Sequence, residues 1–407
     1  MQTNFSLEQL ADPNIAEANK ILRACVHCGF CTATCPTYQL LGDELDGPRG
    51  RIYLIKQVLE GHEPTQKTQL HLDRCLTCRN CETTCPSGVQ YGRLVDIGRK
   101  VVEEKVARPA GQRALRYVLK EGLPRKGLFS TAMKAGQQVR GLLPEVLRNK
   151  VPARQKAGAW PARAHARKMV LLDGCVQSAM APNINAATAR VLDALDVQVV
   201  AADKAGCCGA LRFHMNDQDA ALDDMRRNID AWWPLVESGA EAIVMTASGC
   251  GVTVKEYGHL LRHDTMYADK ARRISEMTRD LSELLLPFET ELLQKLNGKI
   301  GKRIAYHPPC TLQHGQRIRG TVETLLRAAG ADVQLCAESH LCCGSAGTYS
   351  VLHPQLAYPL RDRKLQNLLA TQPEMIVSAN IGCQTHLQSG TEMPVRHWIE
   401  VIDQALN

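Results

Sequence analysis

Residues 25–36 read CVHCGFCTATCP, and residues 75–86 read CLTCRNCETTCP. Each stretch holds four cysteines in the spacing C-x2-C-x2-C-x3-C and continues with proline. Four deprotonated thiols form a soft ligand set that suits iron and also zinc. Structural zinc sites usually combine two C-x2-C pairs, whereas these stretches are two sets of four that each end in Cys-Pro. The spacing therefore favours iron–sulfur clusters over zinc.

The spacing is that of the bacterial ferredoxin motif, in which three closely spaced cysteines bind one cluster and the fourth binds the other. We therefore predict two [4Fe–4S] clusters in the N-terminal part of the chain. The predicted ligands of the first cluster are Cys25, Cys28, Cys31 and Cys85, and those of the second are Cys75, Cys78, Cys81 and Cys35.

The segment between the two motifs is predicted to be helical. Gly47-Pro48 is a typical helix start. The apolar residues that follow have helical spacing: Ile52, Ile55, Val58 and Leu59. Residues 1–98 are therefore predicted to form an α-helical, ferredoxin-like domain. Arg49 and Arg51 are interpreted as part of a solvated face, in preference to donors that bind cluster sulfurs.

The second half of the chain contains a repeat built on eight more cysteines. The first copy has Cys175, Cys207, Cys208 and Cys250, and the second has Cys310, Cys342, Cys343 and Cys383. In both copies the single cysteine stands 32 residues before a Cys-Cys-Gly sequence. Strand-like and helix-like segments repeat with the cysteines, so we predict two tandem α/β domains, residues 169–296 and 297–407. Cys336 has no counterpart and is interpreted as structural.

Each predicted α/β domain could bring four thiols together at its strand ends. We interpret them as candidate iron–sulfur or thiol redox sites. The alternative is that they are buried small hydrophobic residues left from an ancestral site. His307 and His314 flank Cys310, where either could tune a cluster, but we favour their interpretation as hydrogen-bonded loop histidines.

The connector between the cysteine-rich halves, residues 99–168, is strongly basic. It has 18 Lys and Arg against four acidic residues, a net charge of +14, whereas the whole chain of 407 residues carries +7. Apolar residues recur between the bases at near-helical spacing, which is typical of a basic amphipathic helix. Three interpretations remain open: contact with an anionic membrane surface, contact with an acidic partner subunit, or a solvated face.

Several function classes have no support in the sequence. The first twenty residues lack a basic and then apolar leader, and no apolar stretch reaches the roughly 18 residues of a membrane span. No glycine-rich nucleotide motif is present, and the few aromatic residues argue against nucleic-acid binding. We expect a cytoplasmic protein that moves electrons for a partner, since no acid–base pair for carbon chemistry is evident.

Taken together, the two ferredoxin motifs, the basic connector and the two Cys-Cys-Gly domains resemble a known family over essentially the whole chain. This family consists of the iron–sulfur subunits that serve flavin-linked 2-hydroxyacid dehydrogenases. Related branches serve anaerobic glycerol-3-phosphate dehydrogenase, lactate utilisation and heterodisulfide reductase. The stretch GPRGRIYLIK, residues 47–56, is part of the similarity. Within the family, the chain most resembles the branch that serves bacterial glycolate oxidase.

The resemblance implies FAD-containing partner subunits that oxidise glycolate to glyoxylate. This chain would accept their electrons and pass them toward membrane quinone, as a peripheral protein on the cytoplasmic face of the inner membrane. The family pattern ends each Cys-Cys-Gly domain in C-x-x-C, but here Thr253 and His386 stand at the last position. That departure argues against the alternative of a thiol–disulfide reductase and makes His386 a further candidate ligand. Further iron–sulfur binding in these domains remains open, as does service to a lactate or glycerol-3-phosphate dehydrogenase.

Overall fold

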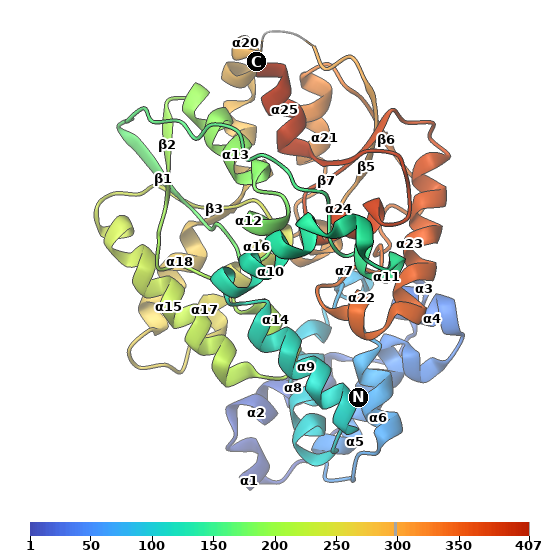
Figure 1. Cartoon of the computed structure of the whole chain (residues 1–407). Helices are drawn as coiled ribbons and strands as arrows, with labels where there is room; N and C mark the ends of the chain where they lie inside the picture. The colour runs from blue at the N-terminus through green and yellow to red at the C-terminus, as the bar shows by residue number, and fades with distance from the viewer. Residues whose placement is uncertain (297–298, 407) are drawn as a thin grey trace.

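The computed structural model describes residues 1–296 and 299–406 (Figure 1). A helical N-terminal module occupies the bottom of the view, two α/β domains lie above it, and the connector crosses in front. The predicted start of the second domain at residue 297 and the chain end at 407 lie outside the described residues.

The N-terminal module is helical, as the sequence predicts. Helices α5 and α8 pack on one another, and α5 begins at Pro48 and buries its predicted apolar residues. Gly98 of α8 permits this packing, because a Cβ there would lie 2.6 Å from Ile55. The elements are α1 (Leu7–Leu10), α2 (Pro13–Ala24), α3 (Phe30–Ala33), α4 (Pro36–Leu41), η1 (Glu44–Asp46), α5 (Pro48–Leu59), α6 (Gln66–Asp73), α7 (Asn80–Thr84) and α8 (Tyr91–Lys105).

The interpretation of Arg51 as a solvated residue is wrong. Its side chain is 1% exposed, and its Nη2 lies 3.4 Å from Asp46 Oδ1. The guanidinium also donates to the His71 carbonyl at 2.7 Å and to Thr37 Oγ1 at 3.2 Å. The cause is the packing of α4, η1 and α6 around the guanidinium, since Thr37, Asp46 and His71 lie in these three elements. Arg49 is half-exposed and pairs with Glu44.

The second half of the chain forms two α/β domains, which confirms that part of the predicted fold. Each has a four-stranded parallel sheet, in the order β2-β1-β3-β4 or β6-β5-β7-β8. In both sheets the first strand of the domain is central, so the chain crosses from one side of it to the other. The strands are β1 (Arg167–Leu171), β2 (Val197–Ala201), β3 (Ile243–Met245), β4 (Thr278–Asp280), β5 (Arg303–His307), β6 (Asp332–Leu335), β7 (Met375–Ser378) and β8 (Val395–His397).

Helices cover both sheets. Those of the first domain are α12 (Gln177–Met180), α13 (Asn183–Ala194), α14 (Ala210–His214), α15 (Gln218–Glu237), α16 (Ser248–Lys255), α17 (Tyr257–Leu260), α18 (Ala268–Met277), α19 (Leu281–Leu285), η3 (Leu286–Phe288) and α20 (Glu289–Lys295). Those of the second are η4 (Thr311–Gly315), α21 (Thr321–Ala328), α22 (Tyr349–Leu352), α23 (Pro354–Leu369), α24 (Ile381–Gln388) and α25 (Trp398–Leu406).

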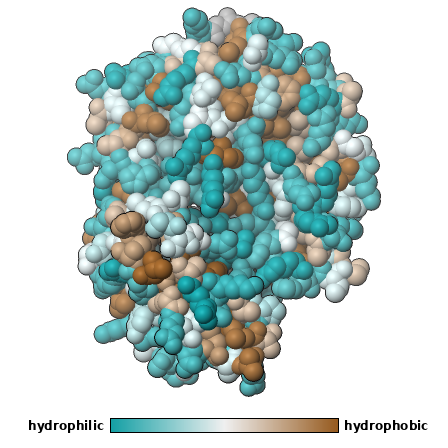
Figure 2. All heavy atoms as spheres, turned by 180° about the vertical axis from the view of Figure 1, so that it is seen from behind, coloured by the Kyte–Doolittle hydropathy of each residue, from teal (hydrophilic) through white to brown (hydrophobic). Residues whose placement is uncertain are grey.

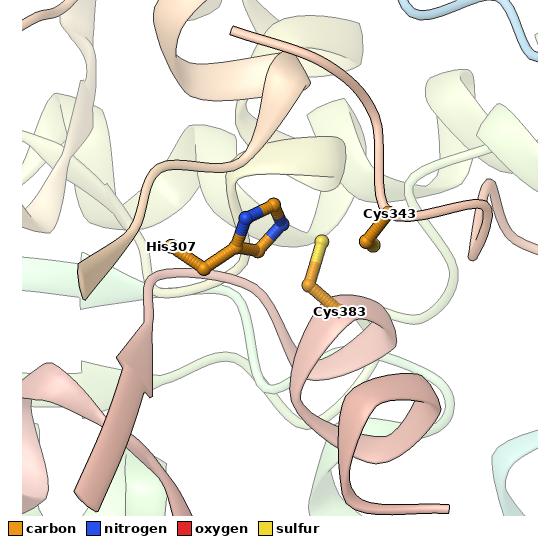
Figure 3. A group of neighbouring side chains, drawn as sticks. All are labelled: His307, Cys343 and Cys383. Atoms are coloured by element: carbon orange, nitrogen blue, oxygen red, sulfur yellow. The ribbon is translucent and has the colours of Figure 1, made fainter. Parts of the chain in front are cut away.

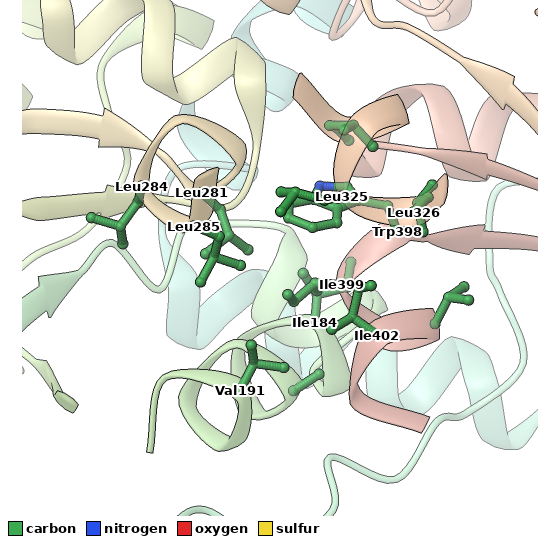
Figure 4. Packing of buried hydrophobic residues seen from close by; sticks show 14 of the residues in the cluster. Ile184, Val191, Leu281, Leu284, Leu285, Leu325, Leu326, Trp398, Ile399 and Ile402 are labelled. Atoms are coloured by element: carbon green, nitrogen blue, oxygen red, sulfur yellow. The ribbon is translucent and has the colours of Figure 1, made fainter. Parts of the chain in front are cut away.

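The two α/β domains share one hydrophobic core. α13 packs on α25 and α19 packs on α21, so corresponding helices of the two copies make reciprocal contacts. Figure 4 shows Ile184 and Val191 of α13 close to Ile399 and Ile402 of α25. His397 Nε2 meets the Thr246 carbonyl at 2.9 Å across the same boundary. The duplicated domains therefore associate much as two subunits would about an approximate twofold axis.

The connector lies against the rest of the molecule and carries α9 (Ala110–Gly122), α10 (Lys126–Gln138), η2 (Arg140–Leu142) and α11 (Glu145–Arg148). Arg108 binds Asp73 at 2.6 Å, and Lys120 binds Asp217 at 2.6 Å. Part of its positive charge is thus neutralised by acidic residues of the N-terminal module and the first α/β domain. The opposite face of the molecule is mostly hydrophilic, with scattered apolar side chains (Figure 2). No helix in the described ranges combines the length and the apolar character that crossing a membrane requires.

Candidate iron–sulfur sites

The first predicted cysteine group comes together in the structure. Burial and the neighbouring thiols of Cys25, Cys28 and Cys85 raise the pKa of the Cys31 thiol to about 11. The same four cysteines line a small cavity. Neighbouring thiols raise one another's pKa because two thiolate charges repel. A bound metal cation removes this repulsion and deprotonates its thiol ligands. The donor set therefore suits a cluster.

The second predicted group also comes together. Burial, followed by the thiols of Cys78, Cys75 and Cys35, raises the pKa of Cys81 well above its ordinary value. Cys35 thus lies with the cysteines of the later motif, as Cys85 lies with those of the earlier one. The Thr37 hydroxyl lies 3.3 Å from Cys35 Sγ, and Arg51 donates to that hydroxyl. Arg51 is therefore linked to this cysteine group through the Thr37 hydroxyl.

Both motif loops have the same unusual backbone. His27 and Thr77, each two residues after the first cysteine of its motif, have φ of 56° and 53°. Gly29 and Arg79, each one residue after the second cysteine, have φ of 86° and 60°. Left-handed conformations cost a non-glycine residue about 1 kcal/mol, so a matching pair in two loops indicates a functional constraint.

Arg99 holds the second loop in place and was missed as a site residue in the sequence. It counts among the bases of the connector, but it lies in α8 and is buried. Its guanidinium donates to the carbonyls of Cys75 at 2.6 Å and Leu72 at 2.7 Å. Its basic side chain placed it with the connector in the sequence analysis, so its role at the cysteine loop was not predicted.

The thiols of the first α/β domain meet at the carboxyl ends of its strands, where parallel sheets usually bind ligands. Cys175 follows β1, the Cys207-Cys208 pair follows β2, and Cys250 lies in the first turn of α16 after β3. Hydrogen bonds from Cys175 and Cys208 lower the pKa of the Cys207 thiol well below its ordinary value. Cys250 in turn contacts Cys208, whose pKa is raised. All four predicted residues are therefore brought together.

The second α/β domain repeats this arrangement. Cys310 Sγ lies 3.8 Å from Cys342 Sγ, and Cys343 contacts both Cys342 and Cys383. Gly344 has φ of 87°, and a Cβ there would lie 2.5 Å from the Ala357 carbonyl oxygen. Only glycine permits the loop to turn so close to α23 and bring the vicinal pair inward.

The histidines near these thiols behave differently from one another. His314 has both ring nitrogens engaged, with Thr83 Oγ1 at 2.9 Å and the His340 carbonyl at 2.8 Å. Its interpretation as a hydrogen-bonded histidine is confirmed. His386 stacks on Tyr358 and places Nε2 3.3 Å from the Ala357 carbonyl. His307 ends β5 and lies with Cys343 and Cys383 (Figure 3), so its interpretation as a hydrogen-bonded loop residue is wrong.

The second ferredoxin-type group adjoins the second α/β domain. Cys78 packs against a buried cluster that contains Cys310 and Cys342. Asn80 fixes this contact, because its amide donates to the Thr34 carbonyl at 3.0 Å and to the His340 carbonyl at 3.1 Å. A cavity of about 1730 Å³ extends from there between the N-terminal module, the connector and both α/β domains, and thiols from both domains line it.

Comparison with known proteins supports this division of the chain. Residues 21–89 match a 4Fe-4S dicluster domain, and residues 169–255 and 304–388 each match a cysteine-rich domain. The chain is 58% identical over 407 residues to the glycolate oxidase iron-sulfur subunit of Escherichia coli strain K12, and the alignment covers 100% of this chain and 99% of that protein. The chain belongs to the glycolate oxidase iron–sulfur subunit family.

More distant relatives match most or part of the chain. The probable glycolate oxidase iron-sulfur subunit of Bacillus subtilis strain 168 is 29% identical, over 90% of this chain and 88% of its own length. Lactate utilization protein A of Bacillus licheniformis is 25% identical over 58% of this chain and 99% of its own length. With the dicluster match, the family resemblance and the predicted pair of [4Fe–4S] clusters are confirmed, and the cysteine-rich matches support further iron–sulfur binding.

Proposed function

We propose that this chain is the electron-transfer subunit of a glycolate oxidase complex. FAD-containing subunits oxidise glycolate to glyoxylate, and this chain accepts the electrons and passes them on. The observation that carries the proposal is the similarity along the full length to a glycolate oxidase subunit, combined with four gathered thiol groups. Bound clusters supply one-electron carriers, and the chain supplies their ligands, their spacing and their insulation from water.

The proposed ligands in the N-terminal module are the eight ferredoxin-type cysteines in the crossed grouping. Cys85 joins the earlier motif and Cys35 joins the later one, which agrees with the contacts that raise the pKa values of Cys31 and Cys81. In the α/β domains we propose the four gathered thiols of each copy as further iron–sulfur ligands.

The packing of Cys78 against the buried cluster of Cys310 and Cys342 supports a proposed order of sites along the electron route. Through this contact the second ferredoxin-type group adjoins the thiols of the second α/β domain. We therefore place the second α/β domain next to the second ferredoxin-type group on the route to the acceptor.

The test compares Cys78→Ser with Cys336→Ser in the purified complex, prepared without oxygen. Cys336 is buried and Cys78 half-buried, but Cys336 belongs to none of the four thiol groups, so it controls for the loss of a thiol. Cys78→Ser should disturb one cluster and slow glycolate-dependent dye reduction at least tenfold, whereas Cys336→Ser should leave iron content and rate unchanged. Zinc in place of iron in the unaltered protein, or an undiminished rate in Cys78→Ser, contradicts the proposal.

We further propose that the complex reaches membrane quinone through the connector. Tyr117, Val118 and Leu142 are 62%, 64% and 88% exposed, an unusual set of apolar side chains for a free surface. Arg113 and Lys134 are exposed on the same segment. Apolar side chains flanked by bases are typical of attachment to an anionic membrane surface.

This attachment is measured by flotation of the complex with vesicles. Mixed phosphatidylglycerol and phosphatidylcholine vesicles should retain the unaltered complex, and pure phosphatidylcholine vesicles should retain less. Replacement of Tyr117, Val118 and Leu142 by serine should release it. Equal retention of the triple variant argues that this surface contacts a partner subunit instead.

A further inference from the structure

His307 faces two thiols of the second α/β domain. A ring nitrogen of His307 and the sulfur atoms of Cys343 and Cys383 all lie within 4.8 Å of one another. Figure 3 shows the imidazole ring and the Cys383 side chain pointing toward each other from separate elements. All three residues are buried.

The imidazole of His307 lacks the partners that a buried polar ring normally has. It is 1% exposed, and within the described residues neither of its nitrogens has a hydrogen-bond partner. Burying a polar group without a partner costs about 1–3 kcal/mol, so such groups usually indicate a missing ion, water or ligand. Two other buried histidines, His314 and His397, have partners on both nitrogens.

The fold explains why this histidine reaches the thiols. His307 is the last residue of β5, the central strand, and it pairs in register with Ser378 at the end of β7. Its backbone carbonyl accepts from the Ser378 hydroxyl at 3.1 Å, which fixes the strand end. Cys383 lies in the first turn of α24, the next helix after β7, and Cys343 lies in the loop after β6. The ring therefore points into the same strand-end site as the thiols.

The two copies of the repeat differ at this position. Leu172 stands three residues before Cys175, as His307 stands three residues before Cys310. Leu172 is buried in an apolar cluster of the first domain. The first domain thus offers thiols alone at its strand ends, whereas the second adds an imidazole nitrogen.

We propose that His307 is an iron ligand in the second α/β domain, together with Cys343 and Cys383. A neutral imidazole nitrogen is a good ligand for iron, and a bound metal would satisfy one of the two unpartnered nitrogens. Nitrogen ligands in place of thiolate raise the reduction potential of an iron–sulfur cluster. The inference rests on the proposed iron–sulfur site of this domain. It assigns that site the role of accepting electrons from the cysteine group that contains Cys78.

The experiment uses the full chain, isolated without oxygen and labelled with 15N-histidine or left unlabelled. Pulsed electron paramagnetic resonance is recorded across a redox titration, and the signal lost in Cys343→Ser identifies the second domain. That signal should show coupling to a nitrogen that changes from 14N to 15N with the label. His307→Cys should keep the iron but lose the coupling, and its midpoint potential should fall.

Two matched variants complete the test. His386→Gln alters another buried histidine of this domain and should keep both the coupling and the potential. His307→Leu reproduces the residue of the first domain and should lose the coupling, while the four thiols of the second domain still hold iron. The inference is overturned if the unaltered protein shows no histidine nitrogen coupling, or if the coupling persists in His307→Cys. It is also overturned if iron is found only at the N-terminal cysteines. In that case glycolate-dependent electron transfer by the complex would still support the proposed function.

Discussion

Cys310 Sγ lies 3.8 Å from Cys342 Sγ, although 32 residues separate them in the chain. Cys78 of the N-terminal module packs against both residues. Two thiol groups from distant parts of the sequence therefore adjoin one another where the ferredoxin-type module packs on the second α/β domain. The two cysteine-rich domains therefore differ in their position relative to Cys78, which packs against thiols of the second domain.

This inequality predicts different effects for equivalent cysteine substitutions. Cys342→Ser should slow glycolate-dependent acceptor reduction at least tenfold more than Cys207→Ser, because Cys342 adjoins Cys78 and Cys207 belongs to the other copy. Rates of the purified complex and the iron content of each variant provide the measurement. Equal slowing in both variants contradicts the proposed order of sites.

Gly344→Ala should destabilise the second α/β domain by about 3 kcal/mol, from left-handed strain together with overpacking. The new Cβ would lie 2.5 Å from the Ala357 carbonyl oxygen. Gly347 is the matched control, since its φ is 63° but no atom lies within 4 Å of a Cβ there. Gly347→Ala should cost about 1 kcal/mol. Urea unfolding followed by circular dichroism distinguishes the two, and equal midpoints would show that the close approach is relieved.

Arg51→Met should lower the stability of the N-terminal module by about 3–5 kcal/mol, because it leaves the buried Asp46 carboxylate with fewer partners. Arg49→Met removes a half-exposed ion pair with Glu44 and should cost about 0–1 kcal/mol. The visible absorption of the clusters during urea unfolding reports on both variants. A similar midpoint for the two would mean that His71 and Arg74 compensate for the loss of Arg51.

Stability should fall as the pH is lowered from 6.5 toward 4, in part because of His397. Burial lowers the pKa of His397 to about 4, whereas the unfolded chain takes up the proton near pH 6.5. Between these values the unfolded state binds more protons, so this group's contribution is present above pH 6.5 and is lost as the pH falls. At pH 5 the loss is about 2 kcal/mol.

The His397 contribution is isolated by comparison with His397→Gln, which should give a shallower pH dependence of the urea midpoint. Gln can still donate toward the Thr246 carbonyl, so the contact between the two α/β domains is retained in part. The other buried histidines affect both proteins equally. An unchanged slope in the variant would contradict the assigned role of His397.

The sequence by itself determined the local features of this protein. Cysteine spacing predicted the two ferredoxin-type groups, including the exchange of Cys35 and Cys85, because that spacing specifies how one loop can wrap a cluster. The repeat predicted two α/β domains, and the apolar spacing after Pro48 predicted α5. These features depend on neighbours along the chain, so they can be read from residue types and intervals.

Only the tertiary structure decided the contacts between distant segments. Arg51 was predicted to lie on a solvated face, but contacts with Thr37, Asp46 and His71 bury it. Arg99 was grouped with connector bases that lie elsewhere. The nearness of Cys78 to Cys310 depends on how the module packs on the second domain. His307 reaches Cys383 because β5 and β7 pair in parallel. Such relationships arise from packing between segments far apart in sequence, where residue spacing carries no information about distance.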